Sequence, residues 1–181
     1  LHVHGRHLEK YLSTYYSPNT HLTGEALGLY YLGTQLPFFK RAAHWRKLGE
    51  DILTAELDRQ ILSDGVYFEQ STWYQRYTAD FYTQFLILKT LNGEEMKADV
   101  QEKLETKTQQ ILDFLMYVTR PDGTTPIIGD DDGGHVLPRG SAASDDFRAC
   151  LSTGAVVFGR GDYKHVARNV AEETLWLLGF D

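Results

Sequence analysis

Two short polar segments of this sequence carry side chains whose types and spacing suit chemistry on a charged ligand. The first, Ser17-Pro18-Asn19-Thr20-His21, reads as a turn that enters a helix. An amide and an imidazole two residues apart at a helix N-terminus can hold an anionic oxygen, because the helix dipole is positive there. Glu25, one turn later, is placed to orient the imidazole or only to stabilise the first turn. The plainer alternative is that Asn19 only caps the helix and that His21 only packs.

The second segment, Glu69-Gln70-Ser71-Thr72-Trp73-Tyr74-Gln75-Arg76-Tyr77, gathers an acid, amides, hydroxyls, aromatic rings and a cation just after a glycine turn. A tyrosine beside an arginine has its phenolate favoured by the opposite charge. Tyr74 next to Arg76 is therefore a candidate acid or base, although a free tyrosine has a pKa near ~10. Capping explains the hydroxyls and core packing explains Tyr77, but neither explains the whole cluster. We predict a functional role for Tyr74.

A third polar segment, Gly129-Asp130-Asp131-Asp132-Gly133-Gly134-His135, has three acids in a row. Such a run could bind a hard cation such as calcium, but the alternation and the distant glutamate of an EF-hand are absent. A solvated turn is the simplest alternative. The third alternative is that one or two of these carboxylates line a cleft and bind sugar hydroxyls.

Composition narrows the class of protein. A chain of 181 residues with 42% hydrophobic content is long enough for one sizeable core, so one domain is expected. The net charge of −7 argues against a nucleic-acid binder, although a few arginines in one cleft would still suit an acidic polysaccharide. No apolar run is long enough to span a membrane. The single cysteine, Cys150, permits no internal disulfide and reads as a core residue, and localisation is not readable from the sequence.

Helical periodicity runs through most of the chain. Apolar stripes and breaker residues predict five helices, over about 22–33, 38–62, 72–91, 98–118 and 166–178. Two of the predicted helices end alike, at Ser63-Asp64-Gly65 and Pro121-Asp122-Gly123, one helix pair apart. This recurrence predicts a curved array of helix hairpins whose alternate loops share one rim. The rim would bring together Asn19, His21, Glu69, Tyr74 and Asp130–Asp132.

At these residues the sequence resembles the helical domain of the heparinase II/III-like polysaccharide lyases, a family that includes related alginate lyases. The resemblance implies an all-α fold, an incomplete (α/α) toroid of antiparallel helix hairpins over residues 1–160. Residues 161–181 would end the toroid or link it to a β-sandwich domain, with the stretch Leu151–Arg160 as the approach to that domain. The chain starts at Leu1 inside an apparent helix, so we expect a piece of a larger bacterial protein, periplasmic or extracellular in this family.

The resemblance also implies a reaction, β-elimination in a uronic-acid-containing polysaccharide. Asn19 would donate to the uronate carboxylate with help from His21, and Tyr74 would act as general acid and also as base. The side chains implied to position sugars are Glu25, Glu69, Gln70, Trp73, Gln75, Arg76, Tyr77, Asp130 and Asp132. No cofactor is expected to be required. The family often has histidine after its tyrosine, where this chain has Gln75, and a further basic residue usually comes from the β domain, so the chain alone is expected to be inactive.

Two other functions fit the same residues. An (α/α)-toroid glycoside hydrolase would need two carboxylates flanking the bond, for instance Glu69 and one of Asp130–Asp132. A non-catalytic carbohydrate-binding module would need neither of these carboxylates for catalysis. The sequence does not identify the polymer: heparan sulfate, other glycosaminoglycans, alginate and a bacterial surface polysaccharide all fit.

Overall fold

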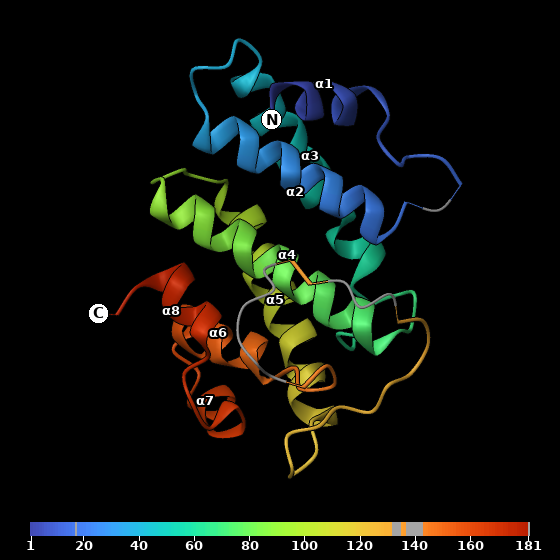
Figure 1. Cartoon of the computed structure of the whole chain (residues 1–181), viewed down its shortest axis with the longest axis vertical. Helices are drawn as coiled ribbons and strands as arrows, with labels where there is room; N and C mark the ends of the chain where they lie inside the picture. Colours follow the sequence, from blue (N-terminus) through green and yellow to red (C-terminus); the bar gives the residue numbers. More distant parts are fainter. Residues whose placement is uncertain (17, 132–134, 137–142, 181) are drawn as a thin grey trace.

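The computed structural model describes residues 1–16, 18–131, 135–136 and 143–180 (Figure 1). Within these residues the fold is all-α, with eight helices and no strand; a single antiparallel bridge joins Ile61 to Tyr67. The helices are α1 (His2–Lys10), α2 (Thr20–Gln35), α3 (Ala42–Gln60), α4 (Thr72–Leu91), α5 (Ala98–Val118), α6 (Arg148–Phe158), α7 (Gly161–Ala167) and α8 (Glu172–Leu178). None of the described helices is both long enough and apolar enough to cross a membrane.

The two longest hairpins are α2 with α3 and α4 with α5. Helices α2 and α3 approach closely because Gly49 faces the backbone of α2. A Cβ at this position would lie 2.4 Å from the carbonyl oxygen of Ala26 and 2.8 Å from the backbone nitrogen of Tyr30. Any side chain at position 49 would push the two helices apart, so this glycine sets the spacing of the hairpin.

Helix α4 is the centre of the molecule. It packs against α2, α5 and α6, and almost every side chain from Thr72 to Lys89 is buried. Because the helix is buried on nearly all sides, its polar side chains do not gather on one solvent-facing side. The core around it includes Leu57, Tyr82, Phe85 and Leu112.

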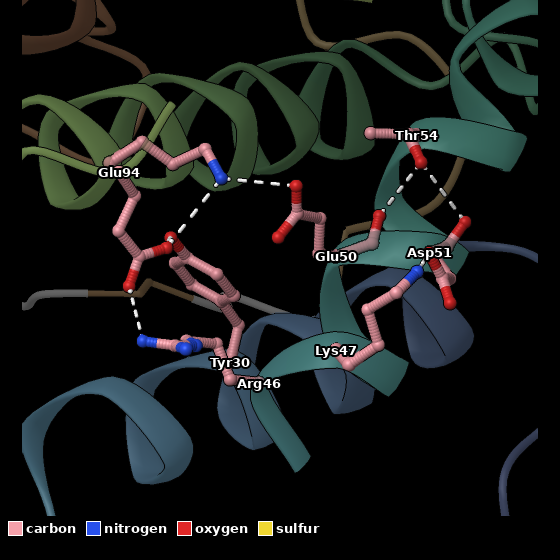
Figure 2. Close-up of polar contacts among 8 residues, drawn as sticks. Tyr30, Arg46, Lys47, Glu50, Asp51, Thr54 and Glu94 are labelled. Carbon is pink, nitrogen blue, oxygen red and sulfur yellow. Dashed lines mark hydrogen bonds and ion pairs between the residues drawn. The ribbon is translucent and has the colours of Figure 1, made fainter. Parts of the chain in front are cut away.

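A buried lysine stabilises the side of the molecule where α2 and α4 end. Lys89 Nζ lies 3.0 Å from Glu50 Oε1 and 3.5 Å from Glu94 Oε2. Glu94 also accepts from the hydroxyl of Tyr30 at 2.6 Å and from Arg46 at 3.0 Å. Figure 2 shows Tyr30, Arg46, Glu50 and Glu94 converging from α2, α3 and the turn after α4. The network therefore fixes the α4–α5 turn to the α2–α3 hairpin.

The structure agrees with the predicted helices over 72–91 and 98–118 and departs from the sequence analysis near the C-terminus. The stretch 151–160 lies mostly in α6 and packs against α4 and α5, and its place before another domain stays a prediction. The helix predicted over 166–178 is two helices, because the chain turns at Arg168, whose φ is +64°. Both α7 and α8 pack against α6.

Candidate active site

Three loops meet at one edge of the helix array, at the starts of α2 and α4 and the end of α3 (right side of Figure 1). The side-chain amide of Gln60, at the end of α3, donates to the backbone oxygens of Pro18 and Asn19 at 3.3 and 3.4 Å. The segment after α5 returns to the start of α4, where Ser71 Oγ donates to the backbone oxygen of Asp130 at 2.7 Å. Segments far apart in sequence therefore form one rim, as the recurrence of helix ends predicted.

Asn19 uses both ends of its side chain. Its Oδ1 accepts from the backbone N–H of His21 at 3.0 Å, which caps α2, and its Nδ2 donates to Glu69 Oε1 at 3.1 Å. A backbone N–H only donates and a carboxylate only accepts, so these two partners set the orientation of the amide. One amide hydrogen is donated to Glu69, and the second has no acceptor among the described residues, so it can serve a ligand.

Glu69 is held by two neighbours. Its Oε2 accepts from the hydroxyl of Tyr67 at 3.0 Å, while its Oε1 accepts from Asn19. Burial and the adjacent carboxylate raise the pKa of Tyr67, so this phenol stays protonated and remains a donor. Tyr67 was not among the predicted site residues. Its position just after the Asp64-Gly65 turn could have marked it as a site candidate, but its burial is evident only from the fold.

His21 and Glu25 do not form the predicted pair among the contacts of the described residues. The His21 side chain is exposed at the start of α2. Glu25 instead accepts from the backbone N–H and the hydroxyl of Ser13, both at 2.7 Å. Its carboxylate therefore anchors the segment that leads from α1 towards the rim.

Tyr74 lies in the first turn of α4 and is partly buried against the core. The N-cap of this helix is Ser71, whose Oγ accepts from the backbone N–H of Tyr74 at 3.3 Å. One residue, Gln70, separates Glu69 from this cap. The site therefore connects Asn19 to Tyr74 through Glu69 and the turn at Ser71.

Three predicted sugar contacts lie inside the fold. Gln75 is 1% exposed; its Oε1 accepts from the N–H of Tyr67 at 2.6 Å, and its Nε2 donates to backbone oxygens of Gly65 and Ile111. Trp73 is 3% exposed and packs edge-on against Phe147, with ring centroids 5.3 Å apart. The structure gives both residues a packing role and turns both away from solvent.

Arg76 is the third of these residues. It is 4% exposed, and its guanidinium lies 2.9 Å from the carboxylate of Asp80, one turn along α4. Two residues along a helix turn the side chain by about 200°, so Arg76 and Tyr74 point to nearly opposite sides. This geometry argues against the interpretation that the charge of Arg76 favours the phenolate of Tyr74.

The remaining predicted contacts lie at the surface of the rim. Gln70 is exposed with φ +56°, Tyr77 is partly buried with its ring 4.5 Å from that of Phe81, and Asp130 is exposed. Asp132 lies outside the described residues. Gln70 and Asp130 are therefore accessible to a ligand.

One group of side chains inside the described part could hold a metal ion. Potential ligand atoms of Asp80, Cys150 and Glu173 lie within 4.8 Å of one another. Cys150 Sγ donates to Asp80 Oδ1 at 3.1 Å, and Arg76 pairs with the other oxygen. The guanidinium of Arg76 already balances the carboxylate of Asp80, so this group is an internal cluster built around one ion pair, with members from α4, α6 and α8.

The rim thus carries an oriented amide with a spare hydrogen, an exposed imidazole and a partly buried phenol. This set can hold an anionic oxygen and exchange a proton beside it. A family model described as the heparinase II/III N-terminus matches residues 1–138, which is most of the chain. The chain belongs to the heparinase II/III N-terminal family. The resemblance of the sequence to this family is thereby confirmed.

Curated relatives of this heparinase II/III region include two heparin-sulfate lyases. That of Bacteroides stercoris is 34% identical over 129 residues, which is 71% of this chain and 19% of the relative. That of Pedobacter heparinus is 32% identical over 122 residues, which is 66% of this chain and 18% of the relative. The chain therefore spans about a fifth of the length of these relatives and is homologous to their N-terminal region.

Solved structures show the same helical fold. A crystal structure of heparinase III matches this heparinase II/III region with a TM-score of 0.58 and 29% identity, over 70% of this chain and 18% of that one. A structure of a heparan sulfate lyase HepC mutant from Pedobacter heparinus matches with a TM-score of 0.66 and 22% identity, over 92% of this chain and 24% of that one. The second likeness concerns the fold alone.

Proposed function

We propose that the complete protein carrying this chain is a lyase that cleaves a uronic-acid-containing polysaccharide of the heparan sulfate class by β-elimination. The chain would form part of an incomplete (α/α) toroid and supply one wall of the active site. The observation that carries the proposal is the amide of Asn19, oriented by Glu69 on the same rim as Tyr74. The homologous heparin-sulfate lyases supply the substrate class.

The first task of the site is to stabilise negative charge. Removal of the proton on C5 of the uronate leaves an anion that is delocalised into the carboxylate, so aimed donors lower the barrier. The unused amide hydrogen of Asn19 is such a donor, and the exposed imidazole of His21 is a second. The charge on Glu69 opposes direct contact with a uronate, so in this proposal Glu69 holds Asn19 in place.

The second task is proton transfer. As the C5–H bond breaks, its electron pair forms the C4–C5 double bond, the C4–O bond breaks, and the leaving oxygen takes a proton. In the proposal Tyr74 begins as the phenolate, takes the proton from C5, and then gives that proton to the leaving oxygen. Gln70 and Asp130 are the accessible residues of the rim that would position sugars. The proposal needs no cofactor, and a β-sandwich domain of the same protein would supply the opposite wall.

A hydrolytic mechanism has less support from the same contacts. An inverting or retaining glycosidase needs two available carboxyl groups. Both oxygens of Glu69 are engaged, by Asn19 and by the hydroxyl of Tyr67, so this carboxylate is poorly placed to protonate a leaving group.

The proposal is tested by incubating the complete protein with heparan sulfate, a second glycosaminoglycan and alginate. A lyase generates a conjugated double bond, so near-ultraviolet absorbance should rise with heparan sulfate. New reducing ends without any such absorbance would identify a hydrolase and overturn the proposal.

A further inference from the structure

The hydroxyl of Ser71 lies between two parts of the candidate site. Its oxygen accepts from the backbone N–H of Tyr74 at 3.3 Å, and its hydrogen is donated to the backbone oxygen of Asp130 at 2.7 Å. A hydroxyl has one donor hydrogen and two acceptor lone pairs, so both bonds form together. Ser71 is 3% exposed, which keeps water from competing for either partner.

The neighbouring residue strengthens this connection. The backbone N–H of Thr72 donates to the oxygen of Ile128 at 3.0 Å, and the N–H of Ile128 donates to Thr72 Oγ1 at 3.0 Å. The segment Ile128–Asp130 is therefore hydrogen-bonded to the N-cap and to the first residue of α4. These bonds cross from the acidic loop to the turn that carries Tyr74.

Gly129 brings the two backbones into contact. Its φ is +76°, and a Cβ here would lie 3.0 Å from Ser71 Cα and 3.1 Å from Ser71 Cβ. Both the backbone conformation and the space favour glycine. With so little clearance, movement of the loop and movement of the N-cap are coupled.

We infer that Ser71 is a positioning residue that holds Tyr74 and the Asp130 loop in one fixed relation. The inference rests on the proposed function, in which Tyr74 transfers the proton and Asp130 contacts sugar. Loss of the hydroxyl would free the first turn of α4 from its cap and the loop from its anchor. A displacement of about 1 Å at a reacting group is enough to cost up to roughly a hundredfold in rate.

The test uses the complete protein and compares Ser71→Thr with Ser71→Val, which have nearly the same shape and differ in the hydroxyl. We expect kcat on heparan sulfate to be roughly tenfold to a hundredfold lower for Ser71→Val than for Ser71→Thr, with a smaller change in KM. Ser71→Ala should resemble Ser71→Val. Equal kcat values for the Thr and Val variants would overturn the inference.

The matched control is Thr108→Val in α5. Thr108 is also buried and donates to a backbone oxygen at 2.7 Å, but it lies outside the rim. Loss of the Thr108 hydroxyl should lower the unfolding temperature by about as much as Ser71→Val does, and should leave kcat unchanged. An equal fall in kcat for Thr108→Val would show a general effect of stability and would overturn the inference.

Amide hydrogen exchange tests the same connection without turnover. Ser71→Val should accelerate exchange at the amides of Tyr74 and Ile128 together, relative to Ser71→Thr. Unchanged exchange at both amides would contradict the inference. A complete protein that yields no unsaturated product would count against the proposed function alone, because coupled exchange at these amides does not depend on catalysis.

Discussion

The side chain of Asn19 caps α2 with its oxygen and binds Glu69 with its nitrogen. The two bonds hold the amide at both its oxygen and its nitrogen, so it is oriented before any ligand arrives. Preorganised donors stabilise developing charge without the cost of reorienting during the reaction. The acid that holds Asn19 is itself held by Tyr67. The proposed function at this scale therefore depends on residues that need not touch the sugar.

Glu69→Gln in the complete protein tests this view of the acid. A neutral amide is a weaker acceptor than a carboxylate, so Asn19 should lose part of its orientation and kcat should fall roughly tenfold. Glu95→Gln, at an exposed acid in the α4–α5 turn, is the control. If Glu69 merely repelled the acidic polymer, the substitution would instead leave kcat unchanged and lower KM.

The local structure of the candidate site could be predicted from the sequence where a rule for helix starts applied. The turn at Asn19 and the cap before Tyr74 follow from helix-start chemistry. The inward direction of Gln75 and Arg76 could not be predicted, because α4 is buried on all sides and its sequence shows no clear polar face. The packing of the neighbouring helices decides whether a polar residue of such a helix faces the solvent or, like Gln75, hydrogen-bonds inside the fold to the backbone of Gly65.

At the scale of elements, the lysine network tests what holds the α4–α5 turn. Lys89→Met leaves Glu50 without its partner and should lower the free energy of unfolding by about 3 kcal/mol. Lys103→Met breaks an exposed pair with Asp58 and should cost at most about 1 kcal/mol. Urea unfolding followed by helical circular dichroism measures both. Equal losses would show that the buried network adds nothing beyond a surface pair.

The docking of α8 on α4 and α6 should depend on pH. Burial, with the nearby charge of Asp80, raises the pKa of Glu173 to about 7, while Arg76 acts in the opposite direction. Burial raises the pKa of Asp80 and of the Cys150 thiol as well. A group with a raised pKa binds its proton more tightly in the folded state. Its stabilising contribution is complete below the unfolded pKa and is lost as pH rises towards about 7.

Comparison of the unsubstituted chain with Glu173→Gln isolates this effect. Between about pH 5 and pH 7, the unsubstituted chain should lose up to about 1.4 kcal/mol per pH unit relative to Glu173→Gln. Glu172→Gln, at the exposed neighbour, should leave the slope unchanged. The free energy of unfolding at several pH values gives both slopes, and parallel curves for Glu173→Gln and the unsubstituted chain would contradict the assignment.

The helices could be predicted where periodicity was long and ended in strong breakers. The pairs Asn92-Gly93 and Asp122-Gly123 follow α4 and α5 directly or nearly so, and both helices match the expected ranges. Helices α6 to α8 are short, with eleven, seven and seven residues. Such short helices depend on packing more than on their own propensity, so their boundaries were not evident in the pattern.

For the whole molecule, the topology explains why remote residues share one rim. Consecutive antiparallel helices return every second loop to the same side, which brings the starts of α2 and α4 together (Figure 1). The recurrence of helix ends was enough to predict this grouping. That recurrence does not predict the directions of the individual side chains. It also does not predict which part of the protein would face the rim.

The most direct test of the account is the turnover of Tyr74→Phe in the complete protein, measured on heparan sulfate as near-ultraviolet absorbance. Loss of the phenolic hydroxyl should lower kcat by about a thousandfold or more, because general acid–base catalysis alone contributes ~10²–10⁴-fold, while affinity for the polymer is nearly kept. Tyr117→Phe, at an exposed tyrosine of α5, should retain full activity. Turnover of Tyr74→Phe equal to that of Tyr117→Phe would remove Tyr74 from the reaction and contradict the account.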